Sequence, residues 1–298
     1  MRMTMASIYR DSEVNIQRTS GRILEFQRQL ASGKRVERPS DDPSAAAGAV
    51  RARSELDSLE QYTRVADSAS SRLTLIDTIL TDVVNKLEYA QTTALSARGA
   101  GKTDAQRESA AQQLEGVRQA LFENLNTSFN GAYVFAGADV LAPPYVRNGD
   151  GSISAYQGST TEVRVDIDNG RTVTTNVDGS AVSQGTAPDD VFAVLDDLII
   201  AVRAGNNDDI GTGLQALDAA FDRATTAQSR LGGDMATVDT QRTSLRQLQT
   251  AARTRLATLE DADFVQAATG MTQADAAYRA ALQSTSQIAR NSLMDYLS

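Results

Sequence analysis

The sequence contains no cysteine, no histidine and no tryptophan. Without cysteine the chain forms no disulfide and has no thiolate nucleophile, and without histidine it lacks the usual proton-transfer group near neutral pH. These absences also exclude nearly all zinc sites and every histidine-based catalytic triad. Only carboxylates and lysine remain available for catalysis. We therefore expect no enzymatic activity, no cofactor and no metal site.

Large rings and long apolar runs are also scarce. Aromatic residues make up 5% of the 298 residues and hydrophobic residues 41%, a composition that suits long, thin helical packing better than one broad core. No stretch approaches the 18 apolar residues that a membrane-spanning helix needs. The net charge of −9 and the pI of about 4.7 argue against a nucleic-acid partner. We predict neither a membrane nor a nucleic-acid interaction.

The first thirty residues contain no apolar core and no cleavage pattern of a signal peptide. Taken alone, this feature predicts a cytoplasmic protein. Residues 1–38 nevertheless form a basic segment in an acidic protein, with eight Lys or Arg residues against four Asp or Glu residues.

Narrow apolar stripes mark a helical arm at each end of the sequence. In the first arm Ile16, Ile23 and Leu30 recur every seven residues with Phe26 between them, and the pattern ends near Ser32-Gly33. In the last arm the stripe contains Ala274, Tyr278, Ala281, Thr285 and Ile288, and Leu293 and Leu297 follow near the end. Stripes this narrow predict helices that pair with each other or with other copies.

Long helices are predicted between the arms. From Ala66 to Ala97 apolar residues alternate by three and four, and the helix from Pro43 to Arg98 would be about 80 Å long. A capping box at Thr103 opens a second helix, which we expect to stop around Asn130-Gly131. A further apolar periodicity predicts a helix that contains Phe192 and ends at Gly205-Asn206. Another predicts a long returning helix that contains Leu214 to Leu259. Gly232-Gly233 leaves the continuity of the returning helix open.

Residues 141–188 change to a strand pattern. Val163, Val165 and Ile167 alternate with charged residues, and Asn169-Gly170 follows as a two-residue hairpin turn. The returning strand continues the alternation through Val177. The sequence thus predicts a small β insertion between helical halves.

The layout is close to a palindrome of arm, acidic break, long helix, insertion, long helix, acidic break and arm. We therefore predict a mainly α fold, an elongated out-and-back bundle of long coiled-coil helices with a small β-rich insertion domain at the tip. The expected segments are an arm at 1–42 that pairs with an arm at 264–298, outgoing and returning helical halves at 43–140 and 189–263, and the insertion at 141–188.

The two acidic breaks are candidate joints between arm and rod. In the first, "RPSDDPSAAAG" (38–48), we expect Asp42 to cap the following helix and Pro43 to be its first residue. The alternative is a cation site, which has no second acidic cluster nearby in the sequence. The second break is "LEDADF" (259–264). The candidate joint residues are Pro39, Asp41, Asp42, Pro43, Glu260, Asp261 and Asp263.

Two further motifs resemble ligand sites, but a structural interpretation is favoured for each. "DIDNG" (166–170) resembles part of a calcium loop, but position 176 is Asn where the EF-hand needs Glu, so a hairpin turn is favoured. Lys34, Arg35 and Arg38 could contact phosphate, but without interleaved aromatic residues we expect a solvated or partner-facing basic patch.

Four separated motifs resemble the flagellin superfamily of bacterial flagellar axial proteins. They are "SGKRVERPSDDPSAAAGAV" (32–50), "LNTSFNGAYVFAG" (125–137), "LEDADF" (259–264) and "LQSTSQIARNSLMDYL" (282–297), the last most similar to the members that join hook and filament. The resemblance covers roughly 1–140 and 190–298. It departs at Ala142-Pro143-Pro144-Tyr145, where the family often has Thr-Gln-Pro-Phe, and at Leu125-Asn126, where Ala-Asn is usual.

This resemblance implies a function that periodicity alone does not give. The family's arms form an inner coiled-coil tube, and the chain is exported by the flagellar type III apparatus without a cleaved signal peptide. The implied location is the extracellular flagellum rather than the cytoplasm. The implied partners are other copies in a ring or helical layer, a hook-side hook-associated protein, flagellin, an export chaperone and the export apparatus. The residues expected at the assembly interface are Ile16, Ile23, Phe26, Leu30, Tyr278, Ile288, Leu293 and Leu297.

Three functions remain open at this stage. The first is a junction adapter between hook side and filament, and the second is a filament-forming minor flagellin. The short β insertion favours the first. The third is a carboxylate-based hydrolase carried on a helical rod, and the insertion shows no acid–base pair for it.

Overall fold

The computed structural model describes residues 5–99, 101–184 and 190–297, with side chains for residue 7 and for residues 9–287 within those ranges. The chain forms two compact units, Met1–Leu59 with Leu248–Ser298 (unit 1) and Glu60–Gln247 (unit 2). The predicted mainly α fold with a small β insertion is confirmed. The five expected segments divide the chain more finely than these two units and stay a prediction.

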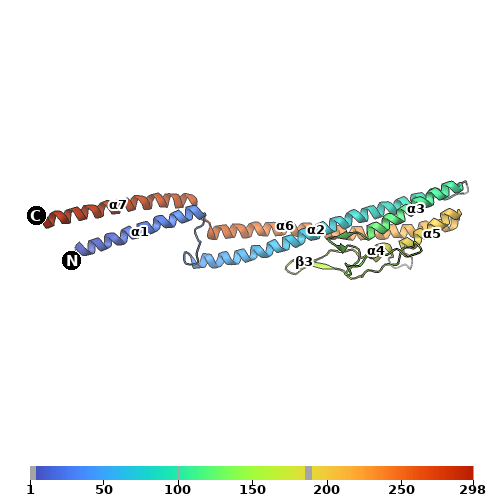
Figure 1. Cartoon of the computed structure of the whole chain (residues 1–298), viewed down its shortest axis with the longest axis horizontal. Coiled ribbons are helices and arrows are strands. Elements are labelled where there is room, and N and C mark those ends of the chain that lie inside the picture. Colours follow the sequence, from blue (N-terminus) through green and yellow to red (C-terminus); the bar gives the residue numbers. More distant parts are fainter. Residues whose placement is uncertain (1–4, 100, 185–189, 298) are drawn as a thin grey trace. The chain divides into compact units, whose positions relative to one another are not determined.

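Unit 1 contains two terminal helices, which we call the arm helices. They are α1 (Met5–Ser32) and α7 (Phe264–Leu297), and they pack along each other in opposite directions (Figure 1). The first turns of α2 (Pro43–Ala97) and the last turns of α6 (Asn207–Glu260) also belong to unit 1. There the buried side chains of α2 are Ala45, Ala49, Ala52, Leu56 and Leu59, and Ala252 is buried on α6.

Unit 2 is built on the apolar stripe of α2. Every residue of the predicted stripe is buried, namely Ala66, Ala69, Leu73, Ile76, Leu80, Val83, Leu87, Ala90, Ala94 and Ala97. The capping box predicted at Thr103 is present and opens α3 (Asp104–Leu125). Helix α5 (Val191–Ala204) packs along α3 and ends at Gly205, whose positive φ of 67° suits glycine (Figure 1).

The α6 helix is continuous through Gly232-Gly233. Leu231 and Val238 on either side of this pair are buried, whereas both glycines are exposed. Burial of such side chains outweighs the cost of about 1 kcal/mol that each interior glycine adds. The break that the sequence left open is therefore absent from the described helix.

The predicted end of the second helix was wrong by several residues. Helix α3 ends at Leu125, and Asn130-Gly131 forms the turn between two short strands, β1 (Ser128–Phe129) and β2 (Ala132–Tyr133). Both turn residues have positive φ, 52° and 80°. An Asn-Gly pair fits a helix stop and a tight hairpin turn equally well, so the pattern alone did not decide between them.

The second hairpin agrees with the sequence. Strands β3 (Arg164–Asp168) and β4 (Arg171–Thr174) pair in antiparallel fashion around Asn169-Gly170, and Ile167 and Val173 are buried. The preferred reading of "DIDNG" as a hairpin turn is confirmed.

The position of the β insertion needs correction. Helix α3 runs back along α2, since Tyr89 bonds to Gln113 and Asn124 bonds to Asp82. Its 22 residues carry the chain about 33 Å away from the α2–α3 turn. The β3–β4 hairpin accordingly meets α6 at Gln241, whose Nε2 donates to Asp168 Oδ2 at 2.8 Å. The insertion thus lies along the helices of unit 2 rather than at its tip.

The "FAG" part of the second motif (125–137) has a structural reason. Gly137 has a φ of 67°, and a Cβ placed there would lie 1.6 Å from the carbonyl oxygen of Ser159. Beside this close approach, Tyr145 is buried with its ring 5.0 Å from that of Phe192. The insertion is therefore packed against α5 through an aromatic core.

Candidate assembly surface: the arm helices and their joint

The apolar stripe of the arm helices is only half covered. Ile16, Ile23, Phe26 and Leu30 of α1 and Tyr278 of α7 are all partly exposed. Among the α1 side chains that the structure describes, none is fully buried, and α7 buries only Ala267 and Ala274 in its described part. The side chains of Ile288, Leu293 and Leu297 lie outside the described residues. The α1–α7 pair thus leaves apolar area for a further partner.

Phe26 of α1 lies against Gly270 of α7. Its ring lies over Gly270 of α7, where an added Cβ would come within 2.5 Å of the ring atom Cζ. Gly270 therefore lets α7 approach the ring, which explains a glycine in the interior of a helix.

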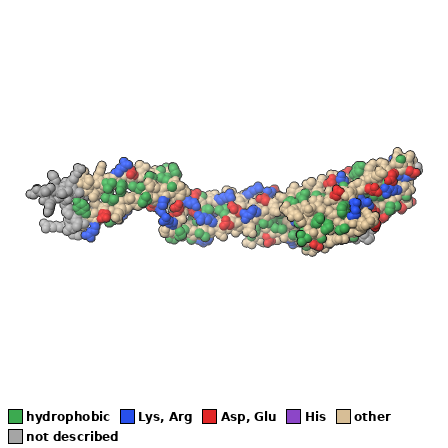
Figure 2. Space-filling view, in the orientation of Figure 1, with side chains coloured by type: hydrophobic (Ala, Val, Ile, Leu, Met, Phe, Trp, Pro, Cys, Tyr) green, Lys and Arg blue, Asp and Glu red, His purple; other side chains and the backbone are tan. Residues whose placement is uncertain are grey.

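Four further exposed apolar side chains on the arm helices were not predicted. Val14 (49% exposed) and Leu24 (60%) on α1, and Val265 (75%) and Leu282 (44%) on α7, stand outside the predicted stripes. Figure 2 shows hydrophobic side chains reaching the surface over these helices. They were not predicted because they lie off the narrow apolar stripes on which the prediction rested.

The first part of the joint is the segment 33–42 between α1 and α2. Gly33, with a φ of 70°, ends α1. Asp41 accepts backbone hydrogen bonds from Glu37 and Arg38, and Asp42 Oδ1 accepts one from Ala45 N at 3.0 Å.

These hydrogen bonds favour the charged form of both aspartates. The hydrogen bond from Arg38 N lowers the pKa of Asp41, and that from Ala45 N lowers the pKa of Asp42. Asp42 therefore caps α2, and Pro43 is its first residue, as the sequence predicts. Pro39 is exposed in the same segment.

The second part of the joint is centred on Glu260, the last residue of α6. Glu260 is only 4% exposed, and its carboxylate forms ion pairs with Lys34 Nζ at 3.1 Å and with Arg53 of α2. Burial alone would raise the pKa of Glu260, but the bonds from Arg53 and Lys34 outweigh it and lower the pKa overall. The carboxylate is thus held charged between two cations.

Backbone bonds join the two parts of the joint. Arg35 N and Val36 N donate to the carbonyl of Glu260 at 2.7 and 3.3 Å, and Ala262 N donates to the carbonyl of Gly33 at 2.9 Å. Lys34 and Asp261 form an isolated antiparallel bridge.

Helix α7 begins just after this bridge with a cap of its own. Asp263 Oδ1 accepts from Val265 N and Gln266 N. The structure therefore brings the two acidic breaks into one polar cluster, although they are far apart in the sequence.

Part of the basic patch has a different role from the one expected. Lys34 pairs with Glu260, and Arg35 contacts Asp42 and the carbonyl of Leu259. Both side chains stay partly exposed, but their contacts are with other residues of the joint. Arg53 was missed entirely, because a single arginine within a long helix carries no local signal of a partner on another helix.

The chemistry of this region is structural. Within the described ranges no group of three or more acidic residues is arranged to hold a metal ion, and no helix there is long and apolar enough to cross a membrane. Asp42 and Asp263 cap helices, and Glu260 pairs with two cations of the same chain.

Comparison with known proteins places the chain in a family. The family model of the bacterial flagellin N-terminal helical region matches residues 5–139, and that of the C-terminal helical region matches residues 214–297.

Two curated relatives are each named flagellar hook-associated protein 3. The protein from Salmonella typhimurium is 28% identical over 223 residues, 70% of this chain and 69% of the relative. The protein from Escherichia coli is 28% identical over 234 residues, 73% of each.

Solved structures share the fold. A putative flagellar hook-associated protein from Vibrio parahaemolyticus superposes with a TM-score of 0.70 at 18% identity, over 74% of this chain and all of the other. The flagellar hook-associated protein 3 of Legionella pneumophila gives 0.62 at 14% identity, over 70% and 98%. Since the two flagellin models together match most of the sequence, the chain belongs to the flagellin superfamily.

Proposed function

We propose that this protein is a structural axial component of the bacterial flagellum that joins the hook side to the flagellin filament and permits filament growth. The observation that carries the proposal is the half-covered stripe of the arm helices. Paired helices with accessible apolar area gain stability when further copies cover that area. The names of the two curated relatives agree with a junction role.

The residues of the apolar stripes would contact other axial subunits. Ile16, Ile23, Phe26, Leu30 and Tyr278 would be covered fully only in the assembled tube, together with Ile288, Leu293 and Leu297. The joint residues Asp42 and Glu260 would hold the α1–α2 and α6–α7 connections in one geometry while neighbouring copies bind.

Partners and location follow from the same proposal. The chain would contact copies of itself in a ring or helical layer, a hook-associated protein on the hook side and flagellin on the other. Export as an unfolded chain, aided by a chaperone and the type III apparatus, would deliver it to the outside of the cell without a cleaved signal peptide. The absence of cysteine suits such passage.

A filament-forming minor flagellin is the second candidate. Its arms would need the same half-covered stripe, so the stripe alone does not separate the two roles. Polymerisation of the purified protein into long filaments would favour the flagellin role. The compact insertion and the hook-associated relatives favour the junction role.

Deletion of the gene in its host tests the proposal. The junction role predicts cells that keep the hook, lack the filament and release flagellin monomers into the medium. Cells that still build a filament of any length contradict the junction role.

Complementation of the deletion strain tests the arm surface. Ile16→Glu places a charge on the half-covered stripe of α1 and should leave the strain without filaments. Leu141→Glu is the matched control, because Leu141 is 85% exposed in the insertion and its change should restore filaments. Equal filament numbers with both variants would contradict a role for the arm surface.

A further inference from the structure

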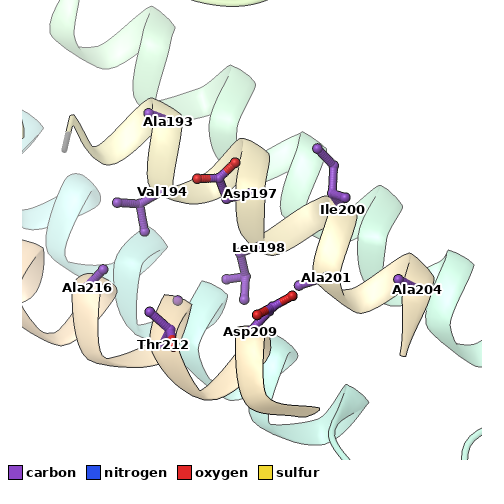
Figure 3. Close-up of a pocket in the computed structure, with 11 residues that line it drawn as sticks. Ala193, Val194, Asp197, Leu198, Ile200, Ala201, Ala204, Asp209, Thr212 and Ala216 are labelled. Atoms are coloured by element: carbon purple, nitrogen blue, oxygen red, sulfur yellow. The ribbon is translucent and has the colours of Figure 1, made fainter. Parts of the chain in front are cut away.

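An apolar groove lies between α5 and the first turns of α6. Its volume is about 360 Å³, and its lining is mostly small or aliphatic, with Val194, Leu198 and Ala201 on α5 and Gly213 and Ala216 on α6. Figure 3 shows these side chains between the two helices. A Cβ on Gly213 would lie 2.8 Å from Leu198 Cδ1, so the glycine lets the helices approach while the alanines leave the groove open.

Two carboxylates accompany the groove, Asp197 from α5 and Asp209 from α6 (Figure 3). Both are exposed, and within the described residues neither forms an ion pair with Lys or Arg. Asp209 bonds only to the neutral Asn206. The nearby Arg203 is already held by Glu108 and Glu115.

Ile200 extends the apolar surface of the groove outward and is 65% exposed. The exposed apolar part of the groove comes from Ala193, Ile200 and Ala204, since Val194, Leu198 and Ala201 are buried. Beside it lie two carboxylates that form no ion pair among the described residues.

A surface of complementary chemistry lies on the first turns of α2. Ala47, Val50, Arg51 and Ser54 share one helical face by their spacing, and all four are exposed. Val50 is 62% exposed. Arg51 donates Nε to the carbonyl of Ala47 in its own helix and, among the described residues, forms no ion pair. Figure 2 shows Lys and Arg side chains over this part of α2 and α6.

We propose that the α5–α6 groove of one copy receives the Ala47–Ser54 face of α2 from a second copy. Val50 enters the apolar groove, the small residues on both sides allow the helices to approach, and Arg51 neutralises Asp197 and Asp209. An amphipathic helix that lies in an apolar groove and is oriented by charge is a common mode of recognition. This inference rests on the proposed function, since copies meet in an ordered array only when assembled.

The contact joins two different surfaces and is therefore heterologous. Repetition of such a contact generates a closed ring or a helical layer rather than an isolated dimer. That outcome agrees with a protein that forms one layer between two other axial components.

The absence of cysteine makes a clean cross-linking test available. Val50→Cys and Ile200→Cys variants are produced together in the deletion strain, flagella are isolated, and disulfides are formed with a mild oxidant. We expect a linked dimer in the mixture and none with either variant alone. The control mixture is Val50→Cys with Leu141→Cys, in which the second position is even more exposed than Ile200 (85% against 65%). It should give at least about tenfold less dimer.

The outcomes separate this inference from the proposed function. Flagella that contain both variants but yield no dimer overturn the groove contact and leave the junction role standing. Flagella that lack the protein altogether overturn both.

A photoreactive group attached to Ile200→Cys identifies the occupant directly. Labelling within residues 47–54 of another copy supports the proposal, and labelling of a different flagellar protein overturns it.

Charge exchange provides an independent test. Asp197→Lys alone and Arg51→Glu alone should each lower the dimer yield by about tenfold, because each leaves like charges facing one another. The combined variant should recover part of the lost yield, at least about threefold over either single change, because it restores one pair of opposite charges while Asp209 stays negative. A combined variant that is as poor as either single change would overturn the pairing of these charges.

Discussion

Glu260→Gln tests whether the joint depends on charge. The change removes one negative charge and almost no volume, so packing around the side chain stays the same. It leaves Lys34 and Arg53 without their anion. Any loss of stability therefore reports the electrostatic part of the joint.

The size of the effect follows from the contacts. A hydrogen bond to a charged group contributes about 1.5–3 kcal/mol, and Glu260 receives one from each of two cations. Gln keeps one oxygen as a neutral acceptor. The side chains of Lys34 and Arg53 are 42% and 51% exposed, so water replaces part of what they lose. We expect the joint to lose about 2 kcal/mol, below the 3–5 kcal/mol typical of a fully buried pair.

Hydrogen exchange measures this loss where it occurs. The amides of Arg35, Val36 and Ala262 donate across the joint to the carbonyls of Glu260 and Gly33. A loss of 2 kcal/mol corresponds to exchange about 30-fold faster at these amides, since each 1.4 kcal/mol is about a factor of ten. Amides in the middle of α2 should keep their protection.

The matched control is Glu55→Gln on the same pair of helices. Glu55 binds Arg255 at 2.9 Å, but these side chains are 45% and 61% exposed. An exposed pair contributes at most about 1 kcal/mol, so exchange should change by no more than about fivefold. If Glu260→Gln changes exchange no more than this control, the buried ion pairs do not hold the joint together.

Three further changes probe the arms and the joint. Asp42→Ala with Pro43→Ala removes the cap of α2 at a cost of about 1 kcal/mol and should weaken assembly; normal motility and normal incorporation at the growing tip would contradict this. Gly270→Ala forces a Cβ into the Phe26 ring and should lower the stability of the arm pair in thermal unfolding by about 1–3 kcal/mol. Adding Phe26→Ala relieves the clash, so the double variant should lose less stability than the sum of the two single variants. A loss equal to that sum would argue against the contact. Folding lowers the pKa of Glu260. Its ion pairs therefore stabilise the joint above the ordinary glutamate pKa of about 4.3, and this stabilisation is lost as the pH falls through the lower folded pKa. Thermal unfolding measured at decreasing pH should accordingly show a larger loss of stability for the parent protein than for Glu260→Gln.

Local patterns predicted the helices and their caps well. The stripe from Ala66 to Ala97 is buried throughout, and Thr103 and Asp42 cap helices as expected, because each of these signals acts over a few neighbouring residues. Where two local meanings existed, as at Asn130-Gly131, the pattern gave the wrong one. Gly232-Gly233 marked a weak point in α6 that burial of neighbouring residues overcomes.

Partners that are distant in the sequence could not be predicted in the same way. Glu260 was placed at a joint by its acidic neighbours, but its pairing with Lys34 and Arg53 depends on how three separate segments meet. The α5–α6 groove likewise results from the close approach that Gly213 allows, and a single glycine in a helix gives no hint of a cavity beside it.

The polar character of the joint follows from where the helices stop. Helices α1 and α6 end there and α2 and α7 begin there, and every helix end leaves backbone groups without partners inside the helix. An apolar core at this point would leave those groups unsatisfied. The carboxylates of Asp42 and Asp263 accept from the first amides of α2 and α7, and the carbonyl of Glu260 accepts from the segment after α1. Because the Glu260 carboxylate is buried within this cluster, it needs counter-charges of its own, which Lys34 and Arg53 supply. The joint should therefore tolerate changes of shape at its surface better than the loss of a single charge at its centre.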